Sequence, residues 1–414
     1  MVWKKGDGMG DETVSRKLHT GTSTWVDTST THLPHQKTPA KRFYDVIVIG
    51  SGISGALSAY TLADGIRSVL VLDKRTPVTG STLASTAMLQ HEIDVSLTDL
   101  STMIGAEKAA RAWRRSAKAV ETLKDIILWD NIDCDFQVKD TIYLSGPEMG
   151  YRAMKRETAL RCKQGLDAQY LTGSELKEKY GIDRTAAIVS KPSASCNPAQ
   201  LTAGLLKRAL AKGAELVSPL EVTDILATQE EVSLRLSDKR KLTCRHLVIA
   251  TGYEVLRKLK NENHSIISTW ALTAKPKSPV PTWMDQTLVW EADDPYLYFR
   301  LTRDGYLIAG GEDEEFKKSH YNRKKLHEKT DKILRKIESL LGIEFNTPDY
   351  RWAAPFGTTM TGLPLIGAVP KEPNVYTAMG FGGNGITFSM IAAEIITKLI
   401  EGETDEDQDI FALN

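Results

Sequence analysis

The sequence contains few cysteines and has no excess of charge of either sign. Its 414 residues include four cysteines, Cys134, Cys162, Cys196 and Cys244, which form no CxxC pair and no Cys/His cluster. Scattered cysteines predict neither a metal site nor a disulfide framework, and they are typical of a reducing compartment. Lys and Arg total 53, and Asp and Glu also total 53. This balance gives no support for a nucleic-acid partner or a membrane-surface partner.

Long apolar runs are also missing. The most apolar stretch, residues 386–400, is interrupted by Thr387, Ser389, Glu394, Thr397 and Lys398. It therefore falls short of the roughly 20 apolar residues that a membrane span needs. The N-terminus lacks the apolar segment of a secretory signal. We expect no membrane span and a cytoplasmic location.

What the sequence does contain, near its start, is a pattern of strand, glycine turn, helix and strand. The apolar run at residues 46–49, which follows Asp45, leads into Gly50, Gly52 and Gly55, and a second apolar run at 69–72 ends in Asp73. This order is typical of a dinucleotide-binding βαβ unit. The first two glycines allow a tight turn and close approach of the backbone to a pyrophosphate, and the third allows close helix packing. Asp73 would accept a hydrogen bond from a ribose hydroxyl.

The rest of the chain alternates between helical and strand patterns. Helical periodicity appears at about residues 106–129, 197–210 and 321–341, and strand patterns dominate residues 213–217, 233–252 and 265–312. Residues 1–42 are polar and read as an N-terminal arm, of which Trp25 is expected to dock on the body. Residues 403–414 read as an acidic tail exposed to solvent.

Further motifs follow the βαβ unit in a characteristic order. They are the loop at 80–90, the strand ending in Ala250-Thr251-Gly252, the segment 352–367 and the glycine-rich turn at 380–386. Together these motifs make residues 44–400 resemble the FAD-dependent D-amino-acid oxidase superfamily, which includes glycine oxidase and sarcosine oxidase. Residues 23–25 and 356–359 are similar to a bacterial subgroup in which some members carry a C-terminal Rieske domain. The Cys/His pairs that such a domain requires are absent from this sequence.

The resemblance implies an α/β fold in which a strand-rich, antiparallel substrate domain is inserted into an FAD-binding Rossmann-like domain. We expect the FAD-binding domain to comprise residues 43–87, 196–254 and 346–402. The substrate domain would then comprise residues 88–195 and 255–345.

The resemblance also implies which residues hold FAD. The glycine turns bring backbone N–H groups to phosphates and to the flavin, and the hydroxyl-rich loop at 81–86 adds side-chain donors. The candidates are Gly50, Ser51, Gly52, Ile53, Ser54 and Gly55; Asp73, Lys74 and Arg75; Ser81, Thr82, Ser85, Thr86 and Met88; Val222, Ala250, Thr251 and Gly252; and Gly357, Gly380, Gly382, Gly383, Asn384, Gly385, Ile386 and Thr387.

The substrate site departs from the family pattern. Relatives that oxidise amino acids hold the substrate carboxylate with basic side chains, because a buried carboxylate needs charged partners. The matching positions in this sequence are Gln90, Phe356 and Thr387. The cysteine that links flavin covalently in some relatives is missing from residues 354–360, so we expect noncovalent FAD.

Two readings follow from these departures. Either the substrate lacks a free α-carboxylate, or a different basic side chain binds that carboxylate. The candidates for this side chain are Arg300 and His91. Arg300 fits equally well a strand residue that faces solvent or pairs with Asp304, and His91 fits a structural histidine. Trp270, Tyr298, Trp352 and Phe356 would form either an aromatic pocket or ordinary core.

The resemblance implies oxidation of the C–N bond of an amine or amino acid by hydride transfer to flavin N5. We assign no catalytic base, because an amine that binds in its neutral form needs none. The electron acceptor would be oxygen or another oxidant. The alternatives are FAD-dependent oxidation of a C–O or C–C bond in a biosynthetic pathway, and a flavin-binding protein without turnover.

Overall fold

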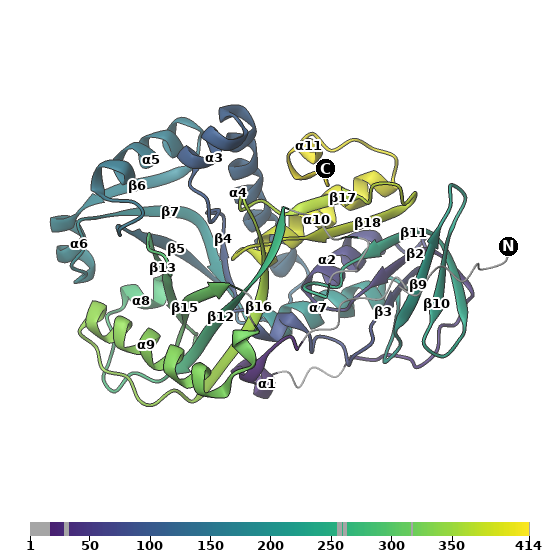
Figure 1. Ribbon diagram of the computed structural model, residues 1–414, viewed down its shortest axis with the longest axis horizontal. Coiled ribbons are helices and arrows are strands. Elements are labelled where there is room, and N and C mark those ends of the chain that lie inside the picture. Colours follow the sequence, from purple (N-terminus) through teal and green to yellow (C-terminus); the bar gives the residue numbers. More distant parts are fainter. Residues whose placement is uncertain (1–16, 29–32, 255–258, 260–262, 316–317, 414) are drawn as a thin grey trace.

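Two β-sheets organise the protein, and Figure 1 shows them side by side with the helices packed around them. The structure is a computed structural model, and it describes residues 17–28, 33–254, 259, 263–315 and 318–413. An eight-stranded sheet carries the glycine motif, and a ten-stranded sheet forms the other half. The mixed α/β architecture is the one that the sequence predicts.

The eight-stranded sheet is parallel at its centre. Its order is β17-β18-β11-β2-β3-β8, and a β9–β10 hairpin continues from β11. All neighbouring pairs from β18 to β8 are parallel, which the apolar, β-branched sequences of these strands favour because both faces are covered. The strands are β2 (Phe43–Ile49), β3 (Val69–Leu72), β8 (Glu215–Val217), β9 (Val222–Ala227), β10 (Val232–Leu236), β11 (Lys241–Ile249), β17 (Leu365–Ala368) and β18 (Val375–Met379).

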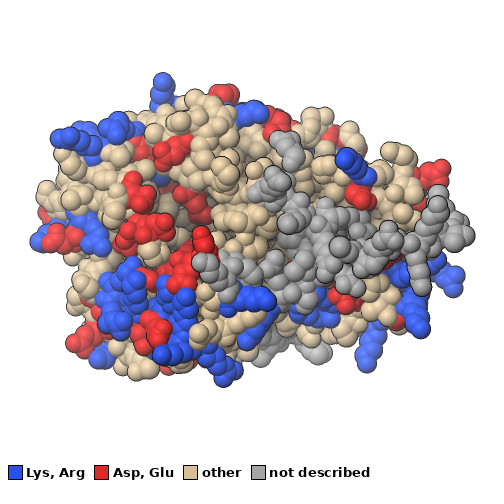
Figure 2. Space-filling model, viewed as in Figure 1, with Lys and Arg blue, Asp and Glu red and all other residues tan. Residues whose placement is uncertain are grey.

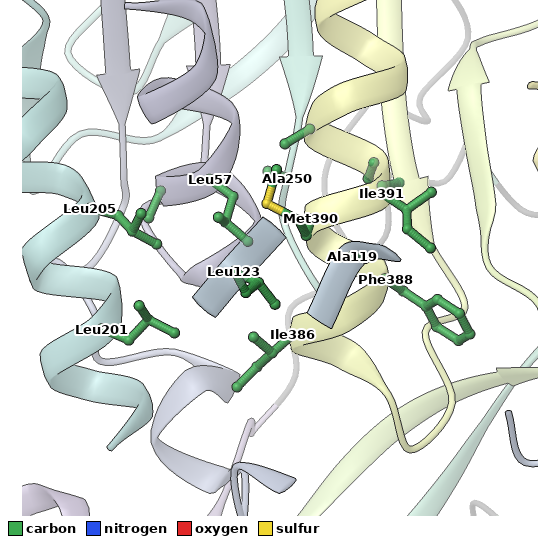
Figure 3. Packing of buried hydrophobic residues seen from close by; sticks show 14 of the residues in the cluster. Leu57, Ala119, Leu123, Leu201, Leu205, Ala250, Ile386, Phe388, Met390 and Ile391 are labelled. Atoms are coloured by element: carbon green, nitrogen blue, oxygen red, sulfur yellow. The ribbon is translucent and has the colours of Figure 1, made fainter. Parts of the chain in front are cut away.

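Four helices from distant parts of the sequence pack together beside this sheet. They are α2 (Ile53–Leu62), α4 (Ala106–Trp129), α7 (Pro198–Ala211) and α10 (Gly385–Ile400). Figure 3 shows Leu57, Leu123, Leu205 and Met390, one from each helix, meeting in one apolar cluster. The helix α7 begins where the sequence predicts, because the Asn197 side chain accepts hydrogen bonds from the first turn.

The ten-stranded sheet is antiparallel except where β13 meets β5. Its order is β1-β16-β12-β15-β14-β13-β5-β7-β4, and β6 pairs with β7. Its strands are β1 (Thr20–Thr22), β4 (Met88–Gln90), β5 (Gln137–Leu144), β6 (Asp167–Thr172), β7 (Ala186–Ser195), β12 (His264–Ala274), β13 (Thr287–Glu291), β14 (Leu297–Leu301), β15 (Leu307–Glu315) and β16 (Tyr350–Thr359).

The remaining helices cover the ten-stranded sheet or join the two halves. The long helix α9 (Arg323–Leu341) packs on β12, β15 and β16. Figure 2 shows Lys and Arg gathered in the region of α9 with acidic residues among them, and Lys329, Lys332 and Lys336 all pair with the buried Glu312. The other helices are α1 (Trp25–Thr28), η1 (Ser81–Ala84), α3 (Leu97–Ile104), α5 (Tyr151–Lys163), α6 (Gly173–Tyr180), α8 (Trp283–Gln286), η3 (Ser319–Tyr321) and α11 (Gln408–Phe411).

One segment of the predicted FAD-binding domain lies in the ten-stranded sheet. The sequence assigns residues 346–402 to the FAD-binding domain, but β16 belongs to the ten-stranded sheet, where it pairs with β12 along its whole length. The apolar alternation of β16 does not reveal which sheet it joins. The passage to the eight-stranded sheet comes after Thr359, where β17 begins at Leu365.

The acidic tail is not solvated as the sequence predicts. Asp405 and Asp407 are buried, and they form ion pairs with Arg115 and Arg111 of α4. The ring of Phe411 is fully buried. The prediction was wrong because the arginines that receive these carboxylates lie almost 300 residues earlier in the chain.

The described part of the N-terminal arm is anchored on the body. Trp25 is 5% exposed, as the sequence predicts for a docked residue, and β1 adds to the edge of the ten-stranded sheet beside β16. Residues 1–16 and 29–32 of the predicted arm lie outside the described residues. No helix among the described residues is long and apolar enough to cross a membrane.

Candidate functional site

One cavity is lined by residues from both sheets. One end is formed by the turns that follow β2, β3 and β11, and the other end is formed by β12, β14, β16 and the turn before α10. The turns at the first end lie at the carboxyl ends of parallel strands, where open α/β sheets bind ligands. The cavity therefore joins a nucleotide-type site to the substrate-side sheet.

The glycine turn after β2 has the geometry that its sequence predicts. Gly50 has a φ of +108°, and a Cβ added there would lie 2.3 Å from the carbonyl oxygen of Ala250. A Cβ added at Gly55 would lie 1.9 Å from the carbonyl oxygen of Gly50. At Gly52 an added Cβ would approach only the Thr82 hydroxyl, at 3.1 Å, so this backbone faces the cavity. The helix α2 begins here, and because its N-cap Gly52 has no side chain, the Thr82 hydroxyl accepts from the first helical N–H, that of Ile53, at 3.0 Å.

Asp73 closes the first end of the cavity. Its Oδ2 accepts hydrogen bonds from the backbone N–H and the hydroxyl of Ser51, at 2.8 and 2.6 Å, and its Oδ1 accepts from the backbone N–H of Arg75. The Arg75 guanidinium makes a bidentate pair with the buried Glu254, at 2.6 and 2.7 Å, and Lys74 lies 3.2 Å from the same carboxylate. The two basic side chains at this end are therefore neutralised.

The loop at 81–86 forms the middle of the cavity wall, and side chains from distant segments hold its backbone. Each of them donates a hydrogen bond to a carbonyl oxygen of this loop, and the Thr82 and Ser85 hydroxyls accept hydrogen bonds from the backbone N–H groups of Ile53 and Ala87. The donors are Trp25 Nε1 to Ser85 (2.7 Å), Trp352 Nε1 to Ala84 (2.9 Å) and Arg300 Nε to Thr86 (2.9 Å).

The turn before α10 brings a carboxylate into the cavity. Asp94 Oδ2 accepts a hydrogen bond from the backbone N–H of Gly383 at 2.9 Å. An added Cβ at Gly382 would lie 2.5 Å from this oxygen, so glycine is needed beside the carboxylate. The Asn384 side chain donates to the carbonyl of Glu92 and leaves the N-terminus of α10 without a side-chain cap.

Aromatic side chains line the second end of the cavity. They include Trp290, Tyr296, Tyr298, Phe356 and Phe381, with Tyr253 from the turn after β11 beside them, and the polar groups at this end include Gln90, Asp94 and Thr269. The Tyr296 and Tyr298 rings lie 5.6 Å apart between centroids. Burial raises the pKa of all three tyrosines above the usual range, so they stay neutral.

A buried ionic network supports this aromatic end. Arg161 donates to Glu92 at 2.7 Å and to Glu157 at 2.8 Å, and all three side chains are almost inaccessible. The second oxygen of Glu92 accepts from the Trp290 indole at 3.2 Å. Trp290 also stacks on Tyr143 with 3.9 Å between centroids. The network thereby fixes the orientation of one aromatic wall.

Most of the predicted cofactor positions line the cavity, and a few lie directly behind its wall. Those behind the wall serve packing: Ser51 holds Asp73, Gly55 lets α2 approach Gly50, and Thr387 donates to the carbonyl of Gln90. Gly357 and Gly380 also lie outside the lining. The predicted residues in the lining are Gly50, Gly52, Ile53, Ser54, Asp73, Lys74, Arg75, Ser81, Thr82, Ser85, Thr86, Met88, Val222, Ala250, Thr251, Gly252, Gly382, Gly383, Asn384, Gly385 and Ile386.

Of the predicted substrate residues, some line the cavity and others lie in the core. Gln90, Tyr298 and Phe356 line the cavity. Trp352 and Trp270 instead lie in the core, and Trp270 faces Lys329 of α9.

Neither candidate cation reaches the cavity. His91 is buried, and its Nδ1 bonds to the carbonyl of Pro192. Arg300 neither faces solvent nor pairs with Asp304, because its guanidinium is buried against the carbonyl oxygens of Thr86 and Cys196. This burial lowers its pKa to about 10.

Sequence reasoning missed several residues of the lining, of which Asp94, Trp290 and Tyr296 are the most informative. Asp94 lies four residues after Gln90, so its closeness in the chain to a predicted substrate residue could have indicated it. Trp290 and Tyr296 are strand or turn residues that no local pattern distinguishes from core. Among the described residues, no group of three or more His, Cys, Asp or Glu side chains could hold a metal ion.

Comparisons with known proteins agree with this geometry. A Bacillus subtilis (strain 168) protein named as a Rieske 2Fe-2S iron-sulfur protein is 23% identical over 380 residues, which cover 89% of this chain and 70% of that protein. Gamma-glutamylputrescine oxidoreductase of Escherichia coli K12 is 23% identical over 372 residues, covering 87% and 84% of the two chains. The crystal structure of glycine oxidase from Geobacillus kaustophilus superposes with a TM-score of 0.75 at 20% identity, covering 90% and 99%.

A family model extends the match over most of the chain. The model described as FAD dependent oxidoreductase (DAO) matches residues 45–399. The fold class predicted from the sequence is confirmed by the glycine oxidase superposition. The motif order that suggested the resemblance is therefore explained by common descent, and the chain belongs to the DAO family of FAD-dependent oxidoreductases.

Proposed function

We propose that this protein oxidises the C–N bond of an amine or amino acid and that it binds FAD noncovalently. The observation that carries the proposal is the cavity that joins the Gly50–Gly52 turn and Asp73 to an aromatic chamber on the other sheet. A cofactor held along such a cavity would present its reactive part to the chamber. The relatives named glycine oxidase and gamma-glutamylputrescine oxidoreductase support the choice of C–N chemistry.

The residues present fit FAD. The helix α10 reaches the cavity with no side-chain cap, so its first N–H groups are available to anionic groups. At α2 the first N–H, that of Ile53, donates to the Thr82 hydroxyl at 3.0 Å, so only the N–H groups after it are available. Gly52 has room for a phosphate where a Cβ would stand, and Asp73 can accept further hydrogen bonds from a ribose. We propose that the loop hydroxyls at 81–86 and the backbone at 382–386 hold the remainder.

Noncovalent binding is proposed from the lining itself. None of the described residues that line the cavity is a cysteine or a histidine, two of the side chains that commonly form a covalent link to flavin. Acid precipitation of the purified protein should therefore release all of the yellow colour into the supernatant. Flavin that stays with the precipitated protein would show a covalent link and contradict this part of the proposal.

FAD, when bound, would supply the two-electron acceptor for a hydride from the carbon that carries nitrogen. The protein's part is to orient the substrate and exclude water, which the Trp290, Tyr296 and Phe356 walls would do. No histidine in the described lining offers a general base, so we propose that the amine reacts in its neutral form. The four free cysteines suit a reducing compartment such as the cytoplasm.

The test is anaerobic bleaching of the flavin. The purified holoprotein would be mixed with amines, N-methyl amino acids, D-amino and L-amino acids, and hydroxy acids, and the loss of flavin absorbance would be followed. At least one C–N compound should reduce the flavin, and admitting air would then show whether oxygen is the electron acceptor. Reduction by hydroxy acids alone would overturn the proposal in favour of C–O oxidation.

A further inference from the structure

The aromatic end of the cavity presents a carboxylate and no cation. Among the described residues of the whole lining, Lys74 and Arg75 are the only basic side chains, and both lie at the other end, paired with Glu254. Arg300 is turned away into the protein. The three positions at which the family pattern has carboxylate-binding side chains are Gln90, Phe356 and Thr387. A substrate carboxylate would therefore find no charged partner among the described residues at this end.

Asp94 has the properties of a ligand-binding group. Its Oδ2 accepts from Gly383, whereas its Oδ1 has no hydrogen-bond partner among the described residues. The Asp94 side chain is exposed through the cavity, and the protein around it still removes enough solvent to raise the pKa of its carboxyl group. Gly382 and Gly383 make room for the Asp94 carboxylate, because a Cβ added at either position would lie within 3 Å of a carboxylate oxygen. The carboxylate is thus open on the side that faces the cavity.

A second carboxylate lies directly behind the aromatic wall. Both oxygens of Asp313 are inaccessible to solvent and have no hydrogen-bond partner of ordinary length among the described residues. The Tyr296 and Thr269 hydroxyls, which line the cavity, lie close enough to it to favour its charged form, although burial raises its pKa to about 7. Asp313 and Asp94 also repel each other electrostatically. The local potential therefore favours a cation.

The aromatic walls favour the same kind of ligand. The faces of Trp, Tyr and Phe rings attract ammonium groups, and this attraction grows as water is excluded. Trp290, Tyr296, Tyr298 and Phe356 line the same end of the cavity as Asp94. A carboxylate set among aromatic rings is a recognition site for an ammonium ion rather than for an α-amino acid.

We propose that the substrate is a cationic amine with no carboxylate on the reacting carbon, and that the Asp94 carboxylate binds its ammonium and accepts one of its protons, so that the amine reacts in its neutral form. This inference rests on the proposed C–N oxidation and narrows it to one class of substrate. It follows that a carboxylate on the reacting carbon should weaken binding of the substrate, because that carboxylate would lie near Asp94 without a basic partner.

The first test measures binding without turnover. tert-Butylammonium has no hydrogen on the carbon that bears nitrogen, and pivalate is an anion of the same shape. Titration calorimetry on the holoprotein should show binding of the ammonium and at least tenfold weaker binding of pivalate. Asp94→Asn should weaken ammonium binding about 10- to 100-fold, whereas the exposed Asp183→Asn should not change it.

Three results would overturn the proposal in this test. The first is pivalate binding as tightly as the ammonium, and the second is no binding of the ammonium. The third is an Asp94→Asn protein that keeps the ammonium affinity within twofold. If Asp94→Asn does not retain flavin, Gln90→Arg replaces it, since a cation at this wall should weaken ammonium binding and strengthen pivalate binding.

The second test separates this inference from the proposed function. Butylamine and norvaline differ only by a carboxylate on the reacting carbon. Butylamine should reduce the flavin at concentrations at least tenfold below either enantiomer of norvaline. If norvaline reduces the flavin and butylamine does not, the substrate inference fails and C–N oxidation stands. If no C–N compound reduces the flavin and hydroxy acids do, the proposed function fails.

Discussion

The two halves of the cavity use glycine for opposite purposes. In the nucleotide half, Gly50 and Gly55 remove side chains so that backbone segments approach one another, and the space beside Gly52 stays open. In the substrate half, Gly310 of β15 lies opposite Tyr298 of β14, and an added Cβ would lie 2.2 Å from the Tyr298 hydroxyl oxygen. The nucleotide-half glycines therefore make room for backbone and for a ligand, whereas Gly310 makes room for the Tyr298 side chain.

The polar groups of the two halves also differ, because those at the nucleotide end are paired and the carboxylate at the aromatic end is partly unpaired. At the nucleotide end, Arg75 and Lys74 are satisfied by Glu254, and Asp73 is held by Ser51. At the aromatic end, Asp94 keeps an oxygen open. At the first end the charged groups are therefore preorganised by partners within the protein, whereas at the second end a carboxylate oxygen is left open to a ligand.

The largest effect is expected from Gly50→Ala. An alanine at a φ of +108° is strained, and its Cβ would collide with the Ala250 carbonyl, so we expect a loss of about 3 kcal/mol or more. The flavin-to-protein ratio should fall at least tenfold because the turn that approaches the pyrophosphate is displaced. Absorbance and thermal unfolding measure both effects.

The control for this variant is Gly150→Ala, since nothing lies within 4 Å of its added Cβ and its φ is −80°. Gly150→Ala should keep its flavin and its melting temperature. A Gly50→Ala protein with full flavin content would show that the turn does not decide cofactor binding.

Arg161→Met should break the substrate half without touching the nucleotide half. Removal of the guanidinium leaves Glu92 and Glu157 buried without their cation, which costs about 3–5 kcal/mol. Urea unfolding should show this loss, while the folded protein keeps its flavin. Lys177→Met is the matched control, because its ion pair with Asp183 is exposed and contributes less than about 1 kcal/mol. Equal losses in the two variants would contradict a structural role for the network.

Asp313→Asn should alter the pH dependence of stability. Burial raises the pKa of Asp313 from 3.8 to about 7, so the folded state binds a proton that the unfolded state has released. The stability from this group is complete below about pH 4 and is lost as the pH rises to about 7, by at most about 4 kcal/mol. The Asn variant should lack this decline and should gain stability relative to the parent protein at pH 8.

Chemical unfolding of both proteins at pH 5 and pH 8 measures this difference. The same decline in the Asn variant would assign the pH dependence to another group, for which Asp94, the neighbouring carboxylate with a raised pKa, is the first candidate.

The smallest effect is expected from Gly310→Ala. A methyl group there would push the Tyr298 ring from the cavity wall, so substrate binding should weaken about tenfold, or about 1.4 kcal/mol. Flavin content should stay unchanged, in contrast to Gly50→Ala. Titration of the flavin spectrum with a reducing amine measures the affinity, and Tyr298→Ala should reproduce the effect. An unchanged affinity in both variants would exclude Tyr298 from the binding site.

The fold could be read from the sequence where the pattern was local. The helix at 106–129 and the β2–α2–β3 unit appear where the periodicity and glycine spacing place them. The placement of β16 and the burial of Asp405 could not be read in this way, because each depends on a partner far away in the chain. The same holds for Arg300, whose guanidinium binds carbonyl groups more than 100 residues distant.

The sequence by itself determined the family and the nucleotide end of the cavity. Gly50, Gly52, Gly55 and Asp73 act within one βαβ unit, so their spacing alone describes the geometry. Only the tertiary structure decided the other end. It brings Asp94, Trp290, Tyr296 and Phe356 together from four segments, and it turns Arg300 and His91 away. Whether a charged side chain faces a cavity depends on which strands meet, and no local pattern carries that information.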